Sequence, residues 1–324
     1  MAKAISRFKI RKTKLMPTQY TAITKAQIQR RNYWVGEIEK LSGRFTDDFR
    51  RLRDELHQEV QTLKLDSLLS HLRLCGAIPE RYGHDSSEEK LYSKYTDALL
   101  SEAFNYIGIN SIVLAERADA ADVECAGSGF SFVADAKAFR LSRTAKNQKD
   151  FKVQAMDGWK RGKPYALVVC PIYQLPTRSS QIYQQAIARD VCVFSYSHLA
   201  VIVRLAEKAG KKAAEKTVLA TLKSIASLNP SKDSIAYWKV INDTLIASHK
   251  AVADIWKGEK IVAVESIAIA KEEALTELAS ERERILRMSK QQAVLELIRK
   301  ANLDNRERVI RRVSDTGIMN LVSS

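Results

Sequence analysis

The sequence lacks any apolar run as long as the roughly 18 residues that a membrane-spanning helix needs. Its basic amino terminus is also not followed by the hydrophobic stretch of a signal peptide. These two absences argue against a membrane protein and against a secreted one. We therefore expect a soluble, intracellular protein with no membrane partner.

Cysteine is scarce, and the four cysteines are far apart, at Cys75, Cys125, Cys170 and Cys192. No CxxC pair is present, so we expect neither a zinc site nor a disulfide framework and interpret these residues as small core side chains. The sequence also has no internal repeat, no low-complexity tract, no P-loop and no GxGxxG motif. These absences argue against a repeat protein and against the common nucleotide-binding classes.

Positive charge is abundant, because 53 lysines and arginines stand against 38 acids, a net charge of +15 over 324 residues. Such an excess favours a polyanionic partner, although charge alone does not separate DNA from RNA. Part of the excess lies in a basic arm at residues 1–20. This arm is consistent both with a solvated tail and with a segment that binds phosphate. The basic residues of this arm are Lys3, Arg7, Lys9, Arg11, Lys12 and Lys14.

The most informative segment is VADAK at residues 133–137, a short apolar strand followed by a basic stretch. Side chains alternate between the two faces of a strand, so the carboxylate of Asp135 and the ammonium of Lys137 point the same way. Such triplets are common, and one alone is better explained by solvated surface residues. A second acid in reach of the strand favours a nuclease site instead.

That second acid is Asp122, which lies 13 residues before Asp135 with the turn signal Gly127-Ser128-Gly129 between them. The hairpin that this pattern predicts places Asp122 opposite Ala134 or Asp135, where Cβ atoms are about 5 Å apart. Two carboxylates this close destabilise a fold unless a divalent cation bridges them or one is protonated. Oxygen ligands at close range suit Mg²⁺, and a neighbouring lysine can hold or activate the attacking water.

The region before this strand is predicted to be helical. Residues 21–85 form a charged helical scaffold or dimerisation layer with apolar residues at helical spacing. A capping box at Ser86 to Glu89 then opens a further helix. The apolar residues of the first region are Ile38, Leu41, Phe45, Phe49 and Leu52.

The region after the hairpin has two continuous apolar runs of strand length, at residues 165–173 and 191–197. Runs of this kind are typical of central strands buried on both faces. Helix, hairpin and apolar strands together predict an α/β core over residues 86–209.

The last region, residues 210–324, is predicted to be helical, with interruptions at Asn229-Pro230 and at Gly258. The stretch from residue 263 to residue 302 is rich in Ala, Glu, Leu, Lys and Arg. It suits a packed helical hairpin or a dimer contact, and it carries no recognisable chemistry.

From about Ser86 to Leu205 the sequence closely resembles type II restriction endonucleases of the PD-(D/E)xK nuclease superfamily. The resemblance implies a mixed central sheet flanked by helices, a restriction-endonuclease-like core with large helical amino- and carboxyl-terminal regions. The VADAK strand and the SRTAKNQKDFKV segment at 142–153 carry it, with looser agreement at EKLYSK (89–94), ADV (121–123) and SQIYQQ (180–185).

The resemblance also implies roles for individual residues. Asp122, Asp135 and Lys137 take the catalytic positions, and the two acids hold Mg²⁺, for which Mn²⁺ can substitute. One departure is Ala121, which stands where the motif usually has a proline. A glutamate on the first helix often reaches the metal through water in this class. Glu89 fits that role as well as it fits helix capping, and Glu102 and Glu124 are alternatives.

For the whole protein the resemblance implies a prokaryotic, cytoplasmic homodimer that cuts double-stranded DNA, paired with a DNA methyltransferase that protects host DNA. The implied target is AAGCTT, cut after the first A to leave 5′ overhangs. A nuclease of other specificity, for repair or for a mobile element, and a non-catalytic DNA-binding protein remain alternatives. The candidate DNA-binding residues are Arg140, Arg143, Lys146, Asn147, Gln148, Lys149 and Lys152.

Overall fold

The computed structural model of the chain describes residues 22–114, 120–143, 148–301 and 303–311. The chain divides into two compact units, Met1–Ala274 and Leu275–Ser324, called unit 1 and unit 2 below. The helices are α1 (Lys25–Ile38), α2 (Phe45–Leu74), α3 (Ser87–Tyr106), α4 (Gln148–Phe151), α5 (Val153–Trp159), α6 (Gln181–Ala188), α7 (Tyr196–Ala209), α8 (Lys211–Ser224), α9 (Ser234–Ser248), α10 (Val252–Leu286), α11 (Lys290–Lys300) and α12 (Leu303–Arg311). The strands are β1 (Asn110–Val113), β2 (Val123–Gly127), β3 (Phe130–Ala136), β4 (Tyr165–Cys170) and β5 (Val191–Ser195).

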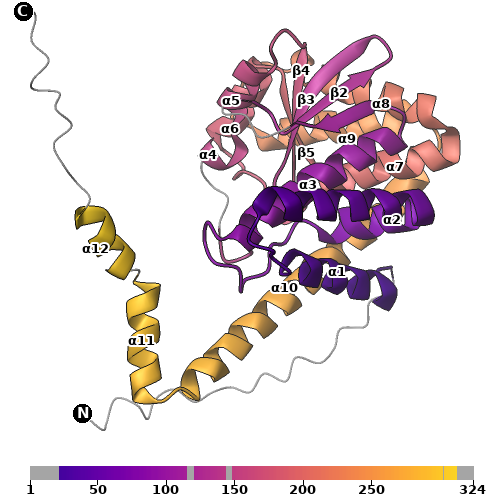
Figure 1. The fold of residues 1–324 in the computed structure, drawn as a ribbon. Helices are drawn as coiled ribbons and strands as arrows, with labels where there is room; N and C mark the ends of the chain where they lie inside the picture. The colour runs from indigo at the N-terminus through magenta and orange to yellow at the C-terminus, as the bar shows by residue number, and fades with distance from the viewer. Residues whose placement is uncertain (1–21, 115–119, 144–147, 302, 312–324) are drawn as a thin grey trace, which may run out of the picture. The chain divides into compact units, whose positions relative to one another are not determined.

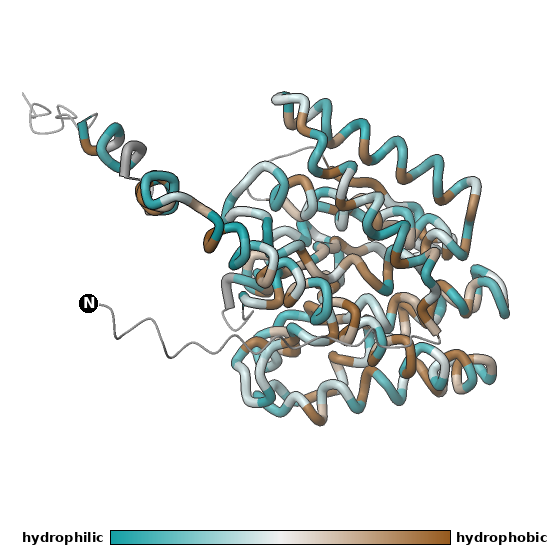
Figure 2. The backbone as a smooth tube through the Cα atoms, turned by 90° about the horizontal axis from the view of Figure 1, so that it is seen from below, coloured by the Kyte–Doolittle hydropathy of each residue, from teal (hydrophilic) through white to brown (hydrophobic). Residues whose placement is uncertain are grey.

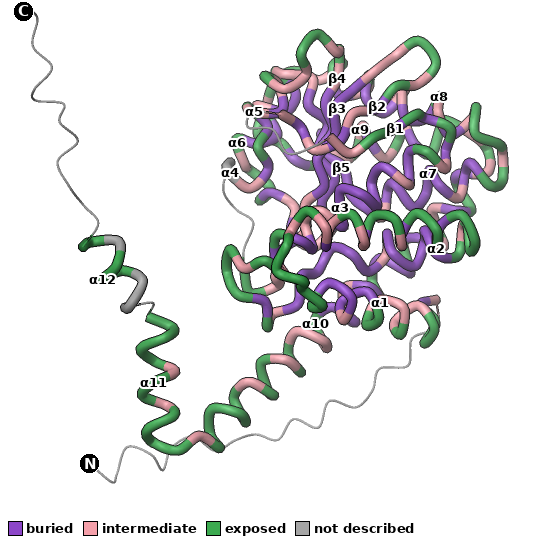
Figure 3. Tube along the Cα trace, viewed as in Figure 1, coloured by how far each residue is buried: buried purple, intermediate pink, exposed green. Residues whose placement is uncertain are grey.

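Unit 1 is built around one five-stranded sheet in the order β1-β2-β3-β4-β5. The pairs β1–β2 and β2–β3 are antiparallel, whereas β3–β4 and β4–β5 are parallel. Helices flank this mixed sheet (Figure 1), and the buried residues gather on the strands and on α7 (Figure 3). The predicted fold class, a mixed central sheet flanked by helices, is therefore confirmed. Among the described residues, none of the helices has the length and hydropathy needed to cross a bilayer.

The predicted hairpin is formed by β2 and β3. Ser128 and Gly129 make its turn, and Gly129 has a φ of +82°, a conformation that glycine adopts without strain. Gly127 pairs with Phe130 at the end of the ladder. A side chain at Gly127 would meet the Phe130 ring at 2.4 Å, so the close packing of this turn requires a glycine there too.

The two apolar runs form β4 and β5, and all of the residues of β5 are buried. However, β5 is the last strand of the sheet and not a central one. Tyr237 on α9 covers this edge: the Val193 amide donates to its hydroxyl at 2.7 Å, and the hydroxyl lies 3.2 Å from the Val193 carbonyl. A side chain from another element thus satisfies backbone groups that an exposed edge would leave to water.

The apolar spacing predicted across residues 38–52 does not belong to one helix. α1 ends at Ile38 and α2 begins at Phe45, and Gly43 in the connection has a φ of +87°. Leu41 lies in this connection and is 37% exposed. The helical period across this segment is therefore interrupted by a turn.

Gly258 does not interrupt the carboxyl-terminal helices, because α10 continues through it. A Cβ at Gly258 would lie 3.2 Å from Nη1 of Arg204. This close approach lets the Arg204 guanidinium lie against α10 and pair with Glu259, whose carboxylate is 2.9 Å away. A tertiary contact thus explains the glycine within the helix.

The early part of α10 packs against the amino-terminal helices of unit 1. Ile23 and Leu74 share a small apolar cluster with Val262 and Ile269 of α10. Glu265 accepts hydrogen bonds from the amides of residues 22 and 23 at 2.9 Å each. Hydrophobic and hydrophilic residues alternate along the helices of unit 1 (Figure 2), as expected of helices that bury one face.

In unit 2, α11 follows the end of α10 and is joined to it by ion pairs, Arg284–Glu296 at 3.2 Å and Lys300–Glu281 at 3.0 Å. None of the residues of α11 is buried (Figure 3). The two helices therefore meet through ion pairs and not through a buried apolar interface, and the packed helical hairpin stays a prediction. A dimer contact stays a prediction as well.

The amino-terminal helices are held together by a carboxylate that is paired on several sides. Glu59 of α2 accepts hydrogen bonds from the Trp34 indole at 2.7 Å and from the Ser67 hydroxyl at 2.6 Å. The Arg30 guanidinium lies 2.9 Å away, and the His71 ring lies 3.2 Å away. Burial opposes ionisation, but the hydrogen bonds from His71, Ser67 and Trp34 outweigh it and lower the pKa of Glu59 to about 2.

We predict that Glu59→Gln lowers the free energy of unfolding by about 1–2 kcal/mol at neutral pH, since Glu59 is partly screened by solvent. A depressed carboxyl pKa contributes stability above the ordinary value of 4.5, and this contribution is lost as pH falls toward 2. The difference between the variant and wild type in urea denaturation should therefore shrink below about pH 4. Asp54→Asn, on the exposed face of α2, is the matched control and should match wild type throughout.

Candidate nuclease site

Three carboxylates meet at the end of the β2–β3 hairpin that is remote from its turn. Asp135 lies on β3, Asp122 directly precedes β2, and Asp97 lies on α3. Oxygens of all three lie within 4.8 Å of one another. Val123 pairs with Ala134 in the hairpin. The residues one step further along the two strands, Asp122 and Asp135, therefore lie side by side, as predicted.

Asp97 was not found by the analysis of the sequence. It is 3% exposed, and its carboxylate accepts a hydrogen bond of 3.3 Å from the Ala136 amide, which ties α3 to β3. Burial raises the pKa of Asp97 well above its ordinary value, and the carboxylates of Asp122 and Asp135 raise it further. A sequence signal did exist, because Asp97 is the one charged residue in the otherwise uncharged stretch 95–101 of a helix.

Lys137 pairs with Asp135, with 2.5 Å between the ammonium and the carboxylate. This contact confirms that the two side chains share one face of the strand. Burial alone would lower the pKa of Lys137, but the charge of Asp135, followed by those of Asp97 and Asp122, outweighs it and raises this pKa above its ordinary value. Lys137 is therefore an ammonium that offsets part of the negative charge of the cluster.

A second lysine, Lys94, also reaches the cluster and is not predicted from the sequence. It lies one turn before Asp97 on α3. Its ammonium is 2.7 Å from the carboxylate of Asp122 and 3.9 Å from that of Asp97. The site thus combines three carboxylates with two ammonium groups.

The donor set fits a hard divalent cation. Asp135 and Asp97 are almost fully buried, whereas the Asp122 side chain is 24% exposed, which gives the cluster access to solvent. The three donors are carboxylate oxygens, without nitrogen or sulfur, the ligand type that Mg²⁺ and Mn²⁺ favour. Crowded carboxylates of this kind are stabilised by a bound cation.

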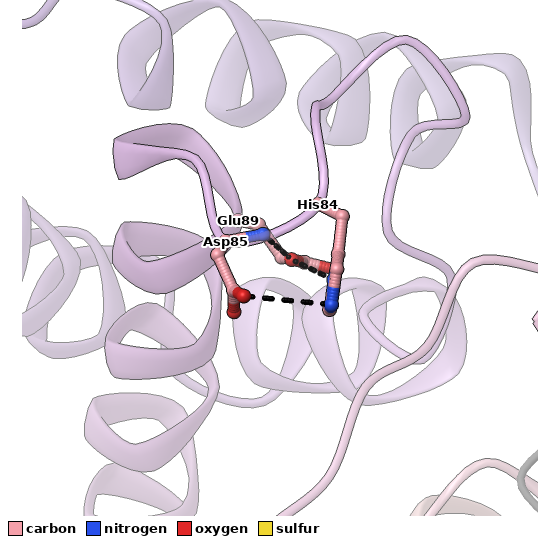
Figure 4. Close-up of side chains that lie close together, drawn as sticks. All are labelled: His84, Asp85 and Glu89. Atoms are coloured by element: carbon pink, nitrogen blue, oxygen red, sulfur yellow. Dashed lines mark hydrogen bonds and ion pairs between the residues drawn. The ribbon is translucent and has the colours of Figure 1, made fainter. Parts of the chain in front are cut away.

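Glu89 lies in a different group of side chains. It is near His84 and Asp85 (Figure 4), and its carboxylate accepts a hydrogen bond of 2.7 Å from the Asp85 amide. Arg140 pairs with it at 3.2 Å. The hydroxyl of Ser86 accepts a hydrogen bond from the Glu89 amide, so the predicted helix cap is present. The Glu89 carboxylate, however, bonds the amide of Asp85 and not that of Ser86. Among the described residues, Asp97 and not Glu89 joins the two predicted acids.

The other two candidate glutamates are also paired elsewhere. Glu102 on α3 bonds His57 at 2.9 Å. Glu124 on β2 pairs with Lys163 at 2.8 Å. Neither belongs to the group of three carboxylates.

Of the candidate DNA-binding residues, Arg140 is engaged within the protein. Besides Glu89, its guanidinium donates to the Tyr82 carbonyl at 2.6 Å, and its side chain is 14% exposed. Arg140 therefore anchors the segment after β3 to the loop before α3.

Two other candidates lie at the surface. The Arg143 side chain is 44% exposed and pairs with Asp150 at 2.9 Å. Lys152 is exposed and lies over the Trp159 ring. Lys146 and Asn147 lie outside the described residues, as do the side chains of Gln148 and Lys149.

Two acids and a lysine at the end of a hairpin in a five-stranded mixed sheet match the motif of the PD-(D/E)xK class of nucleases, here with Ala121 in place of the usual proline. Comparison with known families specifies the class further. The HindIII restriction endonuclease family matches residues 31–314, and the chain belongs to that family.

A curated relative agrees with this assignment. The chain is 40% identical over 170 residues to the type II restriction enzyme HindIII of Haemophilus influenzae (strain ATCC 51907 / DSM 11121 / KW20 / Rd). The match covers 52% of this chain and 56% of the relative, so it spans about half of the relative's length.

Proposed function

We propose that the protein is a type II restriction endonuclease that makes Mg²⁺-dependent double-strand cuts in DNA, with Mn²⁺ able to substitute. The observation that carries this proposal is the convergence of Asp97, Asp122 and Asp135 with Lys137. The assignment to the HindIII restriction endonuclease family supports it.

Each side chain of the cluster has a distinct task in this proposal. Asp122 and Asp135 hold the cation, and Asp97 completes the ligand set from the helix side. The cation, when bound, acts as a Lewis acid that stabilises the charge building on the scissile phosphate. Lys137, held against Asp135, positions the attacking water between the metal ligands and the DNA.

The target follows from the resemblance of the catalytic strand and the segment after it. We propose AAGCTT, cut after the first A to leave four-base 5′ overhangs. A palindrome is cut on both strands most simply by a two-fold homodimer, one site for each strand. Such an enzyme acts in the cytoplasm of a prokaryotic cell, beside a methyltransferase that protects host DNA.

Substitutions in the cluster test the proposed chemistry. Asp122→Asn, Asp135→Asn and Lys137→Ala should each lower the rate of cleavage about a hundredfold or more, because each removes a ligand or the group that positions water. Binding of target DNA in Ca²⁺ should persist, since phosphate and base contacts lie elsewhere. EDTA should stop the wild-type reaction.

The matched control is Asp243→Asn, the same chemical change on α9, where Asp243 pairs with Lys239. This variant should cut like wild type, and circular dichroism checks the fold of all four. Cleavage by Asp135→Asn at the wild-type rate, or full activity in EDTA, would contradict the proposed site.

Digestion of plasmid DNA tests the proposed specificity. Digestion of a sequenced plasmid should give discrete fragments whose ends map to AAGCTT with four-base 5′ overhangs. Each single-base change in the target should cost about 1–3 kcal/mol in binding. Discrete ends at another sequence would reveal a nuclease of different specificity. Smears or nicks would indicate a nuclease that is not a restriction enzyme. Binding without cutting would indicate a non-catalytic DNA-binding protein.

A further inference from the structure

The ammonium of Lys94 has no task in the chemistry above, yet it lies within the acidic cluster. Its distance of 2.7 Å from Asp122 is that of a charge-assisted hydrogen bond. The Lys94 side chain is 15% exposed, so it lies near the surface and not in the deep core. The two lysines divide the acids between them, since Lys137 pairs with Asp135 and Lys94 with Asp122.

Helix α3 supplies both an ammonium and a carboxylate to the cluster. Lys94 and Asp97 are three residues apart and therefore lie on one face of the helix. Asp97 is fixed to β3 through the Ala136 amide, so the backbone position of Lys94 is fixed as well. The lysine side chain itself is long and has four rotatable bonds, which lets its ammonium move while its backbone stays in place.

A divalent cation and the Lys94 ammonium compete for Asp122. Asp122 is the most exposed of the three acids and the one through which the cluster meets solvent. An ammonium held there neutralises the carboxylate that a metal would use, and it repels an incoming cation at short range. The Lys94 ammonium therefore weakens metal binding for as long as it stays on Asp122.

We infer that Lys94 is a built-in counter-ion that keeps metal affinity low until DNA binds. In the metal-free protein its ammonium neutralises Asp122. When DNA is present, a backbone phosphate offers the displaced ammonium a new partner, so metal and DNA bind cooperatively. By thermodynamic linkage the metal then strengthens DNA binding by the same factor. This inference rests on the proposed function, since it needs a divalent cation at Asp122 and a phosphate beside it.

The test measures Ca²⁺ affinity by calorimetry, without DNA and with an AAGCTT duplex, so that binding is read without turnover. Lys94→Gln keeps a hydrogen-bond donor for Asp122 and removes the charge. Without DNA it should bind Ca²⁺ about tenfold more tightly than wild type, and the added effect of DNA on Ca²⁺ affinity should be smaller than in wild type. Lys90→Gln, one turn earlier on α3 and exposed, removes the same charge and should behave like wild type.

A second measurement needs no variant. Acylation of lysine amines, followed by mass spectrometry, should show that Ca²⁺ increases the labelling of Lys94 in the DNA-free protein while Lys90 is unchanged. Unchanged Ca²⁺ affinity in Lys94→Gln, or unchanged labelling of Lys94, would overturn the inference. If the wild-type protein binds no Ca²⁺, or if the Asp135→Asn variant binds Ca²⁺ as tightly as wild type, the metal site itself is overturned, and the inference with it.

Discussion

Crowded negative charge is the constraint on which the site depends. The antiparallel register of β2 and β3 brings Asp122 to Asp135, and α3 adds Asp97 to the same space. Carboxylates within 4.8 Å of one another repel strongly in a buried setting. The fold tolerates them because Lys137 and Lys94 supply positive charge at hydrogen-bond distance. The cost of crowding is the chemical reason for proposing that the site binds a divalent cation.

The rest of unit 1 holds these groups in place. The backbone of Lys137 is bound on two sides, by its own amide to the Val169 carbonyl at 2.7 Å and by the Tyr196 hydroxyl to its carbonyl at 3.0 Å. Strand β4 and the start of α7 therefore fix the backbone of Lys137. Side chains built on such elements are positioned more firmly than those on loops. Arg140, which ties the next segment to Glu89 and Tyr82, extends this frame toward the DNA-binding candidates.

The parts of the site that could be predicted are those set by local rules. Alternation along a strand and one turn signal were enough to place Asp122, Asp135 and Lys137. Asp97 and Lys94 were missed because their position depends on how α3 packs against a strand about 40 residues away, and helical spacing does not say which strand a helix meets.

The misplaced features of the fold have similar causes. The helical spacing from Ile38 to Leu52 continues across a turn, because spacing alone does not show where a helix ends. Gly258 looked like a helix break, since its contact with Arg204 comes from another helix. The edge position of β5 is hidden in the same way, because Tyr237 covers it from 44 positions away. The last two features are decided by tertiary contacts that periodicity does not encode, whereas the first is decided by the turn at Gly43.

The central claim is that the three carboxylates form the metal site, and anomalous diffraction from crystals soaked in Mn²⁺ tests it most directly. We expect an anomalous peak within bonding distance of Asp122 and Asp135, with Asp97 in or beside the coordination sphere. The group of His84, Asp85 and Glu89 offers the alternative set of metal-binding side chains among the described residues. A peak at that group, with none at Asp135, would contradict the account.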